Sequence, residues 1–289
     1  MHSSAVIADL AAFRKQFVLK EGTLNMKSRL LVAAVGIPLI LWAMLWAPVF
    51  VLELLLALLS AIGAYELMKC VNAHPGWIRG TALASGLTLL LGAINGQEFT
   101  QLLQILYVIS FFGLAVRKGG EVKWQEMATV IFSVVLIPYS FSAFLRINDA
   151  GYHRAFLLLP LIFSFASDSG AFFAGLAFGK HKLAPKVSPK KTVEGAIGGL
   201  FGNVIGAVAF ALIMNNCFGQ SIDIWEISLL GLGCSVVAQL GDLSFSLIKR
   251  EFGVKDYGNL FLAHGGVLDR FDSVLFVAPV LTALFSILH

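Results

Sequence analysis

Nine apolar segments, each near the length of about 20 residues that a helix needs to cross a bilayer, run through most of this chain. Hydrophobic residues make up 58% of its 289 residues and charged residues only 13%, whereas a soluble domain has about 25% charged residues. This pattern excludes an ordinary soluble enzyme and predicts an all-α integral membrane protein. We expect about nine transmembrane helices, at 30–47, 49–68, 80–95, 100–116, 128–145, 155–178, 193–216, 227–248 and 272–288.

The chain divides into three parts. Residues 1–26 are weakly amphipathic and lack the apolar core of a signal peptide, so we expect an N-terminal extension or a surface helix there. Residues 27–150 hold the N-terminal transmembrane helices. Residues 151–289 hold a C-terminal catalytic region with two polar cytoplasmic loops, 179–194 and 249–271.

Basic residues gather in every second connection between the predicted helices, with a mild exception in the loop assigned to Arg146 and Arg154. Because basic residues collect in cytoplasmic loops, we expect the N-terminus in the cytoplasm and the C-terminus outside. The chain is thus predicted to be a multi-pass protein of the inner (cytoplasmic) membrane whose active site faces the cytoplasm. These loops also account for the net charge of +4, so no nucleic-acid partner is expected.

Small residues recur at helical spacing from residue 170 onward. Glycines lie four residues apart at Gly175 and Gly179, and again at Gly198, Gly202 and Gly206. This spacing lets helices approach closely, either within one chain or between two copies in a homodimer. No strand and no GxxxxGK[ST] motif accompany these glycines, so they are not a phosphate-binding loop.

Two polar groups precede residue 200. Asp168 lies between two serines in the sixth apolar segment, where it is either functional or satisfied by the neighbouring hydroxyls. The segment 179–195 holds five lysines and two prolines, which predicts a loop leading into a helix. Ser188 or Thr192 would cap that helix and Glu194 would occupy its first turn. Such a terminus suits a triphosphate or a lipid phosphate, although a plain basic loop attracted to anionic lipid is the alternative.

Two further groups follow. Gln239, Asp242, Ser246 and Lys249 have the spacing of a single helical face. The segment HGGVLDRFD places Asp269 and Asp272 on one face of the last helix. Hard oxygen ligands of this kind suit Mg²⁺, while structural pairing is the alternative. Glu53 and Glu66, in the second apolar segment, are expected to pair internally or to lie at a boundary.

With these residues assembled, the chain resembles the CDP-diacylglycerol synthase (phosphatidate cytidylyltransferase) family. The segments SDSGAFFAG, SPKKTVEG and Gln239–Asp242 also look like that family, as does Tyr65-Glu66. Leu262 departs from the family pattern, which usually has proline or glycine there. The family signature near the C-terminus is matched at Ser246, Lys249, Arg250, Lys255, Asp256, Gly258, Phe261, His264, Gly265, Gly266, Asp269, Arg270 and Asp272.

The resemblance implies the conversion of CTP and phosphatidate into CDP-diacylglycerol and diphosphate. It also implies Mg²⁺, with a second cation left open, held by Asp242 and Asp269 with help from Asp256 or Asp272. The substrate-binding candidates are Asp168, Ser188, Lys190, Lys191, Thr192, Ser246, Gly265 and Gly266. The catalytic candidates are Asp242, Asp269, Lys249, Arg250, Lys255, His264 and Arg270, of which His264 would orient a phosphate or assist the loop.

Other functions stay open on sequence alone. A CTP-dependent polyprenol kinase would need similar cations, and an anion transporter would also bury charges. A CDP-alcohol phosphotransferase is disfavoured because its DGxxAR…GxxxD…D pattern does not occur in the chain.

Overall fold

The computed structural model describes residues 36–119, 122–260 and 265–288. Within them, eight helices are long and apolar enough to cross a membrane, and a shorter apolar helix covers Gly36–Leu45. The predicted helical membrane fold is therefore confirmed, and residues 30–35 of the first predicted span lie outside the described part. The helices are α2 (Val49–Cys70), α3 (Pro75–Asn95), α4 (Gln97–Arg117), α5 (Trp124–Ile131), α6 (Ile137–Asp149), α7 (Leu159–Phe178), α8 (Val193–Phe218), α9 (Ile224–Glu251) and α10 (Leu268–Leu288).

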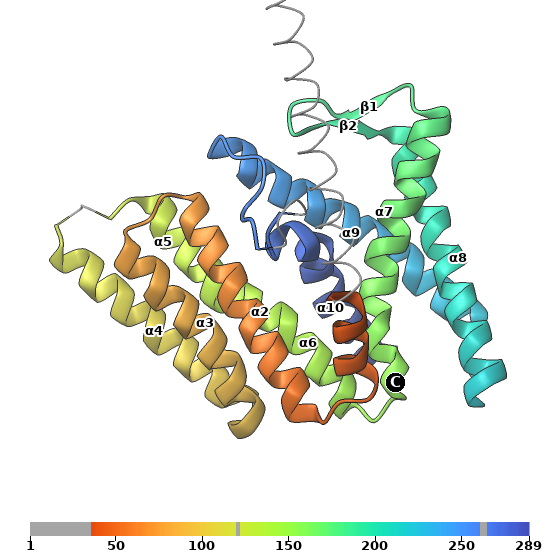
Figure 1. Ribbon diagram of the computed structural model, residues 1–289, viewed down its shortest axis with the longest axis horizontal. Helices are drawn as coiled ribbons and strands as arrows, with labels where there is room; N and C mark the ends of the chain where they lie inside the picture. Colours follow the sequence, from red (N-terminus) through yellow and green to blue (C-terminus); the bar gives the residue numbers. More distant parts are fainter. Residues whose placement is uncertain (1–35, 120–121, 261–264, 289) are drawn as a thin grey trace, which may run out of the picture.

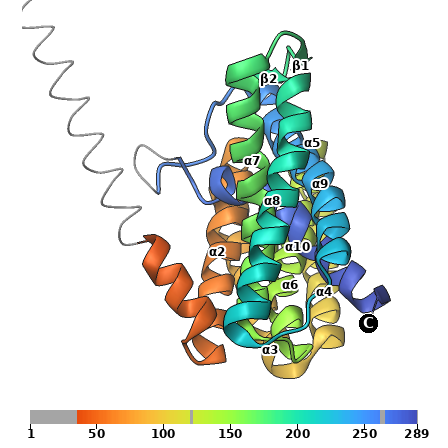
Figure 2. The same ribbon diagram turned by 90° about the vertical axis from the view of Figure 1, so that its right-hand side faces the viewer.

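The helices form two groups with α10 between them. Figure 1 shows α2 to α6 on one side and the α7–α8 pair on the other, and Figure 2 shows most helices running lengthwise through the molecule. α10 packs against α9, α6 and α7. The C-terminal ends of α2, α4, α7 and α9 lie at one end of the bundle, and the C-terminus of the chain lies at the other. The basic segments that follow these four helices therefore share one end, which we call the polar end.

Irregular backbone occurs beside two prolines of the apolar segments. A π-helical turn, Phe132–Leu136, precedes Pro138 and joins α5 to α6 as one span. A 3₁₀ turn, Arg154–Leu158, leads into Pro160 at the start of α7. Proline lacks an N–H and cannot continue a regular ladder, so these turns absorb the break. One expectation is wrong: Arg146 lies inside α6 and not in a loop, because the fifth span extends to Asp149.

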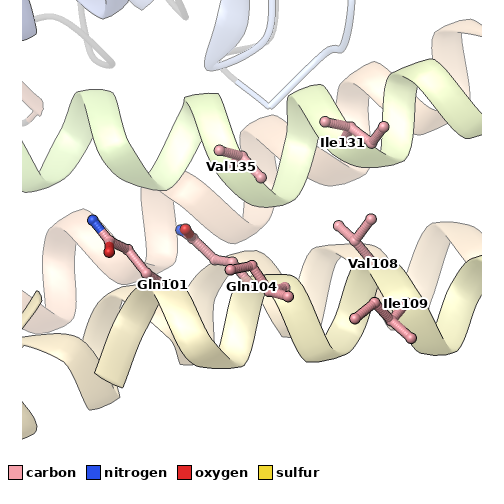
Figure 3. A pocket seen from close by; sticks show the side chains of 7 residues that line it. Gln101, Gln104, Val108, Ile109, Ile131 and Val135 are labelled. Carbon is pink, nitrogen blue, oxygen red and sulfur yellow. The ribbon is translucent and has the colours of Figure 1, made fainter. Parts of the chain in front are cut away.

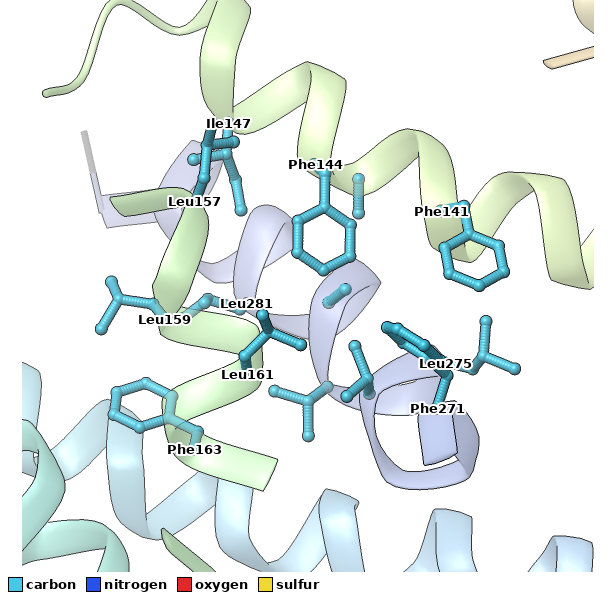
Figure 4. Close-up of a cluster of buried hydrophobic side chains, with 14 of the residues drawn as sticks. Phe141, Phe144, Ile147, Leu157, Leu159, Leu161, Phe163, Phe271, Leu275 and Leu281 are labelled. Atoms are coloured by element: carbon cyan, nitrogen blue, oxygen red, sulfur yellow. The ribbon is translucent and has the colours of Figure 1, made fainter. Parts of the chain in front are cut away.

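A cluster of buried aromatic and aliphatic side chains fixes α10 in the middle of the fold. Figure 4 shows this cluster, in which α6, α10 and the segment leading into α7 meet. The rings of Phe141 and Phe271 lie edge to face, with centroids 5.7 Å apart. Aromatic pairs of this geometry are favourable beyond the apolar area they bury. Because Asp272 follows Phe271 directly, this packing also fixes the position of the Asp272 carboxylate along the bundle.

Glycines allow α7 and α8 to pack backbone against backbone. A Cβ atom built on Gly170 or Gly198 would collide with the other helix, and one on Gly202 would lie 2.5 Å from the Ala166 carbonyl oxygen. The predicted close approach of helices at these glycines thus occurs within one chain.

The segment between α7 and α8 is not the plain loop that its prolines and lysines suggested. It forms an antiparallel ribbon of β1 (Lys182–Ala184) and β2 (Ser188–Thr192), which projects beyond α7 in both views. The Thr192 hydroxyl accepts a 3.1 Å hydrogen bond from the Gly195 N–H, so Thr192 is the cap of α8. Ser188, the other predicted cap, lies in β2. Glu194 accepts from the backbone N–H groups of Lys180 and His181, which ties the ribbon to the first turn of α8.

We predict that Gly202→Ala lowers the thermal stability of the purified protein in detergent. The added methyl group has no room between α7 and α8, and overpacking of this kind costs about 1–3 kcal/mol. Gly233→Ala on α9 is the matched control, because a Cβ there would meet no atom within 4 Å. Equal unfolding temperatures for the two variants would contradict the packing argument.

Candidate active site

Helix α9 supplies a line of polar side chains that faces its neighbours. Gln239 donates to the Ala196 carbonyl oxygen of α8 at 3.1 Å and to the Ser235 hydroxyl at 3.3 Å. Ser246 donates to Asp242 Oδ1 at 3.2 Å. The predicted polar face of α9 therefore exists, but its residues have different roles. Gln239 ties α9 to α8, whereas Asp242 and Ser246 lie nearer the polar end.

The first turn of α10 brings a second carboxylate to the same region. Asp269 Oδ1 accepts a 2.9 Å hydrogen bond from Lys249 Nζ of α9, and both side chains are nearly buried. Its other oxygen accepts from the backbone N–H groups of Tyr257 at 2.8 Å and Gly266 at 3.0 Å. Asp269 thus joins α9, α10 and the connection between them. Gly265, with a φ of 83°, turns the chain just ahead of it, where a Cβ would lie 2.9 Å from Asp269 Oδ2.

Three aspartates from three helices lie within electrostatic reach of one another. Asp242 of α9 interacts with Asp168 of α7 and with Asp272 of α10. Asp272 accepts a hydrogen bond from the N–H of Ser273, and Asp168 is exposed. Sequence analysis assigned Asp168 to substrate binding, but the structure sets it beside the carboxylates assigned to metal. We call Asp168, Asp242 and Asp272 the carboxylate cluster.

Two lysines balance part of this negative charge. Lys191 forms an ion pair with Asp242 Oδ2 and also interacts with Asp168. Lys249 interacts with Asp272 in addition to its pair with Asp269. Because Lys191 belongs to β2, this ion pair joins the lysine-rich ribbon to the carboxylate cluster.

Close approach of α9 and α10 makes the cluster possible. A Cβ on Gly241 would lie 3.0 Å from the Asp272 carbonyl oxygen and 3.1 Å from the Phe276 Cβ. The backbones therefore nearly touch beside Asp242. A short aspartate side chain can then share one space with an aspartate of the neighbouring helix.

Arg250 acts on the backbone and not on the cluster in this structure. Its Nε donates to the Val187 carbonyl oxygen at the turn of the ribbon, 3.3 Å away, and its Nη1 donates to the Val254 carbonyl oxygen at 3.1 Å. Arg250 thus fastens the ribbon to the end of α9.

The connection after α9 is anchored by Tyr257. Its hydroxyl donates to the Phe245 carbonyl oxygen at 2.8 Å, and Lys249 Nζ lies 5.3 Å from the centre of its ring. Burial is the main cause that raises the pKa of Tyr257 above its ordinary value, so the hydroxyl keeps its proton and its bond.

The remaining predicted site residues are more exposed or fall outside the described part. His264 belongs to the latter group. Ser188 lies half-buried in β2. The exposed members are Lys190, Lys255, Asp256 and Arg270.

Sequence analysis missed the role of Glu66. This residue lies on α2, yet its carboxylate accepts from the backbone N–H groups of Val267 and Leu268 at the start of α10. The available signal was an acid inside an apolar segment that follows a tyrosine, in a pair resembling the family. Its partners could not be named because they lie more than 200 residues away.

The carboxylates of the cluster suit a hard cation whose remaining ligands are waters and substrate phosphates. Within the described residues no three His, Cys, Asp or Glu side chains converge as a complete metal site. Mg²⁺ is ordinarily held by one or two carboxylates, with waters and substrate phosphates completing its shell. Two neighbouring carboxylates, Asp242 and Asp272, meet this requirement without a full protein cage.

Two described cavities lie away from these carboxylates. One, of about 330 Å³, lies between α4 and the α5–α6 span and is lined by Gln101, Gln104 and aliphatic side chains (Figure 3). The other, of about 610 Å³, lies among α7, α8 and the segment before α2, and it is mostly apolar. Neither contains a member of the carboxylate cluster.

These features define a polytopic membrane protein that gathers aspartates and lysines from several helices at its polar end. The chain belongs to the cytidylyltransferase family, whose model matches residues 27–288. It is 33% identical over 263 residues to a phosphatidate cytidylyltransferase of Staphylococcus epidermidis, covering 90% of this chain and 98% of that protein. It is 35% identical over 279 residues to a phosphatidate cytidylyltransferase of Haemophilus influenzae, covering 88% and 96%. The family resemblance inferred from sequence is confirmed.

We predict that Lys249→Met destabilises the protein by about 3–5 kcal/mol, because it leaves the carboxylate of Asp269 buried without its cation. Denaturation of the purified protein in micelles measures the loss. Lys255→Met is the control: this exposed side chain should change stability by no more than about 0.5 kcal/mol. A Lys249 variant as stable as the control would show that the ion pair contributes little.

Proposed function

We propose that this chain is a phosphatidate cytidylyltransferase, which converts CTP and phosphatidate into CDP-diacylglycerol and diphosphate. The observation that carries the proposal is the meeting of carboxylates from α7, α9 and α10 with Lys191 and Lys249 at the polar end of a membrane bundle. The relatives' names and the family match point to the same reaction.

In the reaction, an oxygen of the phosphatidate phosphate bonds to the α-phosphorus of CTP, and the bond from that phosphorus to the β-phosphate oxygen breaks. Diphosphate leaves with the electron pair of that bond. Both reactants are anions, and two unit charges 4 Å apart repel by about 4 kcal/mol at an effective dielectric of about 20. The site must therefore supply positive charge and hold the two phosphates in line.

The side chains divide this work by position. Lys191 extends from the ribbon toward the cluster, which suits contact with the phosphates of an incoming nucleotide. Lys249 lies deeper, next to Asp269 and Asp272, which suits contact with a lipid phosphate at the membrane boundary. Ser246 beside Asp242 is a further hydrogen-bond donor for either phosphate.

We assign Mg²⁺ binding to Asp242, assisted by Asp272, with Asp269 as the residue that braces the site. When bound, the metal ion would neutralise phosphate charge and orient the two reactants. Asp272 is supported over Asp256 because it lies within electrostatic reach of Asp242, whereas Asp256 is exposed in the connection. A second cation would find Asp168 as an additional carboxylate.

We propose that the polar end faces the cytoplasm of the inner membrane, with the C-terminus on the outer side. Its basic segments support this orientation, since such residues are retained on the cytoplasmic side. CTP is also supplied there. Assembly into a homodimer stays a prediction.

We predict that Asp242→Ala and Asp269→Ala each lower CDP-diacylglycerol formation by about 100-fold or more, because charge stabilisation and positioning are lost. Purified, folded variants are assayed with cytidine-labelled CTP, phosphatidate and Mg²⁺. Asp149→Asn, an exposed carboxylate at the opposite end of the bundle, is the control that should retain activity. Near-normal turnover in either alanine variant would remove that residue from the site.

We also predict where the phosphorus of CTP goes. Label in the α-phosphate should appear in the lipid product, and label in the γ-phosphate should appear in diphosphate. Transfer of γ-label to a lipid would identify a kinase instead, and label in neither product would contradict both enzymes.

A further inference from the structure

Glu66 connects the N-terminal helices to the site through the backbone. The residue is only 4% exposed, and its two carboxylate oxygens accept one hydrogen bond each: Oε1 from the N–H of Val267 at 3.0 Å and Oε2 from the N–H of Leu268 at 2.9 Å. The first N–H groups of a helix have no partner within the helix, and a carboxylate is favourable beside them. Glu66 of α2 therefore caps α10, the helix that carries Asp269 and Asp272.

The connection ahead of α10 is also shaped around this carboxylate. A Cβ on Gly266 would collide with the Glu66 carboxyl group, and one on Gly258 would lie 2.8 Å from its Cδ. Two separate points of the connection thus pack against one side chain. A side chain at either position would displace the Glu66 carboxyl group from the N–H groups that it binds.

Asp269 also bonds to the backbone of this connection. Oδ2 of Asp269 accepts from the N–H of Tyr257, next to Gly258, and from the N–H of Gly266 itself. Two carboxylates from different helices thus hold the backbone at Tyr257 and at 266–268. Displacement of that backbone would move Asp269 relative to Lys249, and Asp272 relative to Asp242.

We propose that Glu66 is a positioning residue of the active site: by holding the start of α10 it sets where Asp269 and Asp272 stand. Glu66 contacts no member of the carboxylate cluster in the described structure and is not assigned to substrate or metal. The proposal rests on the proposed function for its effect on turnover, but its structural part can be tested separately.

A carboxylate is required because two N–H donors each face their own oxygen. Glutamine would offer one oxygen and one NH₂ group, so one backbone donor would face another donor. Aspartate keeps both oxygens but is shorter by one methylene group, while α2 is fixed by its own packing. Both substitutions should therefore loosen the start of α10 although the fold is retained.

The test compares Glu66→Gln and Glu66→Asp with Glu53→Gln. Glu53 is on the same helix, roughly 20 Å further along it by the rise of 1.5 Å per residue. For the Glu66 variants we expect kcat to fall about 10- to 100-fold, as it does when a residue that orients a ligand is lost. We also expect a higher Mg²⁺ concentration at half-maximal rate and faster amide hydrogen exchange at Val267 and Leu268. Glu53→Gln should match the wild type in all three measurements.

A merely structural role predicts a different pattern. Turnover would then fall only in proportion to the folded fraction, the Mg²⁺ dependence would stay unchanged, and amide exchange would rise throughout α2 and α10. That pattern would overturn the proposal, as would wild-type kcat and exchange in Glu66→Gln. If the wild type makes no CDP-diacylglycerol, the proposed function fails, whereas the exchange measurement still tests whether Glu66 holds α10.

A double substitution covers the case in which a Glu66 variant folds poorly. Gly266→Ala alone pushes a methyl group into the Glu66 carboxyl group and should impair turnover. In a Glu66→Ser background the carboxyl group is gone, so adding Gly266→Ala should cost little more. Independent, additive losses would show that Gly266 is not constrained by Glu66 and would overturn the proposal.

Discussion

The ion pair between Lys249 and Asp269 is the interaction on which the polar end of this protein depends. A charge within a membrane-spanning helix is costly unless it is paired and hydrogen-bonded. Asp269 satisfies this condition with one lysine and two backbone N–H groups. The same contacts join α9, α10 and the chain between them, so electrostatic compensation and the geometry of the site come from one set of bonds.

Glycine has a complementary part in the same arrangement. Aspartate side chains are short, and carboxylates from different helices can meet only where the helix backbones nearly touch. Gly241 provides that approach between α9 and α10, and the glycines of α7 and α8 do so for the pair that carries Asp168 and the ribbon. In a bilayer the hydrophobic effect does not drive helices together, so close packing of the helices is also one of the sources of their association. Stability and site geometry therefore place the same demand on these positions.

Sequence patterns predicted the features that depend on residues close together in the chain. They did not predict the features that depend on contacts between distant segments. Apolar length predicted the spans, and helical spacing predicted that Asp242 and Ser246 would share a face, because both depend on near neighbours in the chain. The ribbon was missed because β1 and β2 are only three and five residues long, and because Glu194 binds the backbone of Lys180 and His181, more than ten residues away in the chain. The extension of α6 through Arg146 was missed because a polar residue at the end of a span resembles a loop.

The hydrogen bonds of Glu66 show why the geometry of this site cannot be predicted from local sequence patterns. The division of the chain near residue 150 follows from where charges are concentrated, and it suggests that the C-terminal half is self-sufficient. Yet α10 packs on α6, and its first N–H groups are bonded to α2. The first half of the chain therefore supplies the surface against which the carboxylates of the second half are held. A membrane protein with few polar residues can fix a charged site in this way, because each buried charge that binds backbone N–H groups also sets the position of the segment it binds.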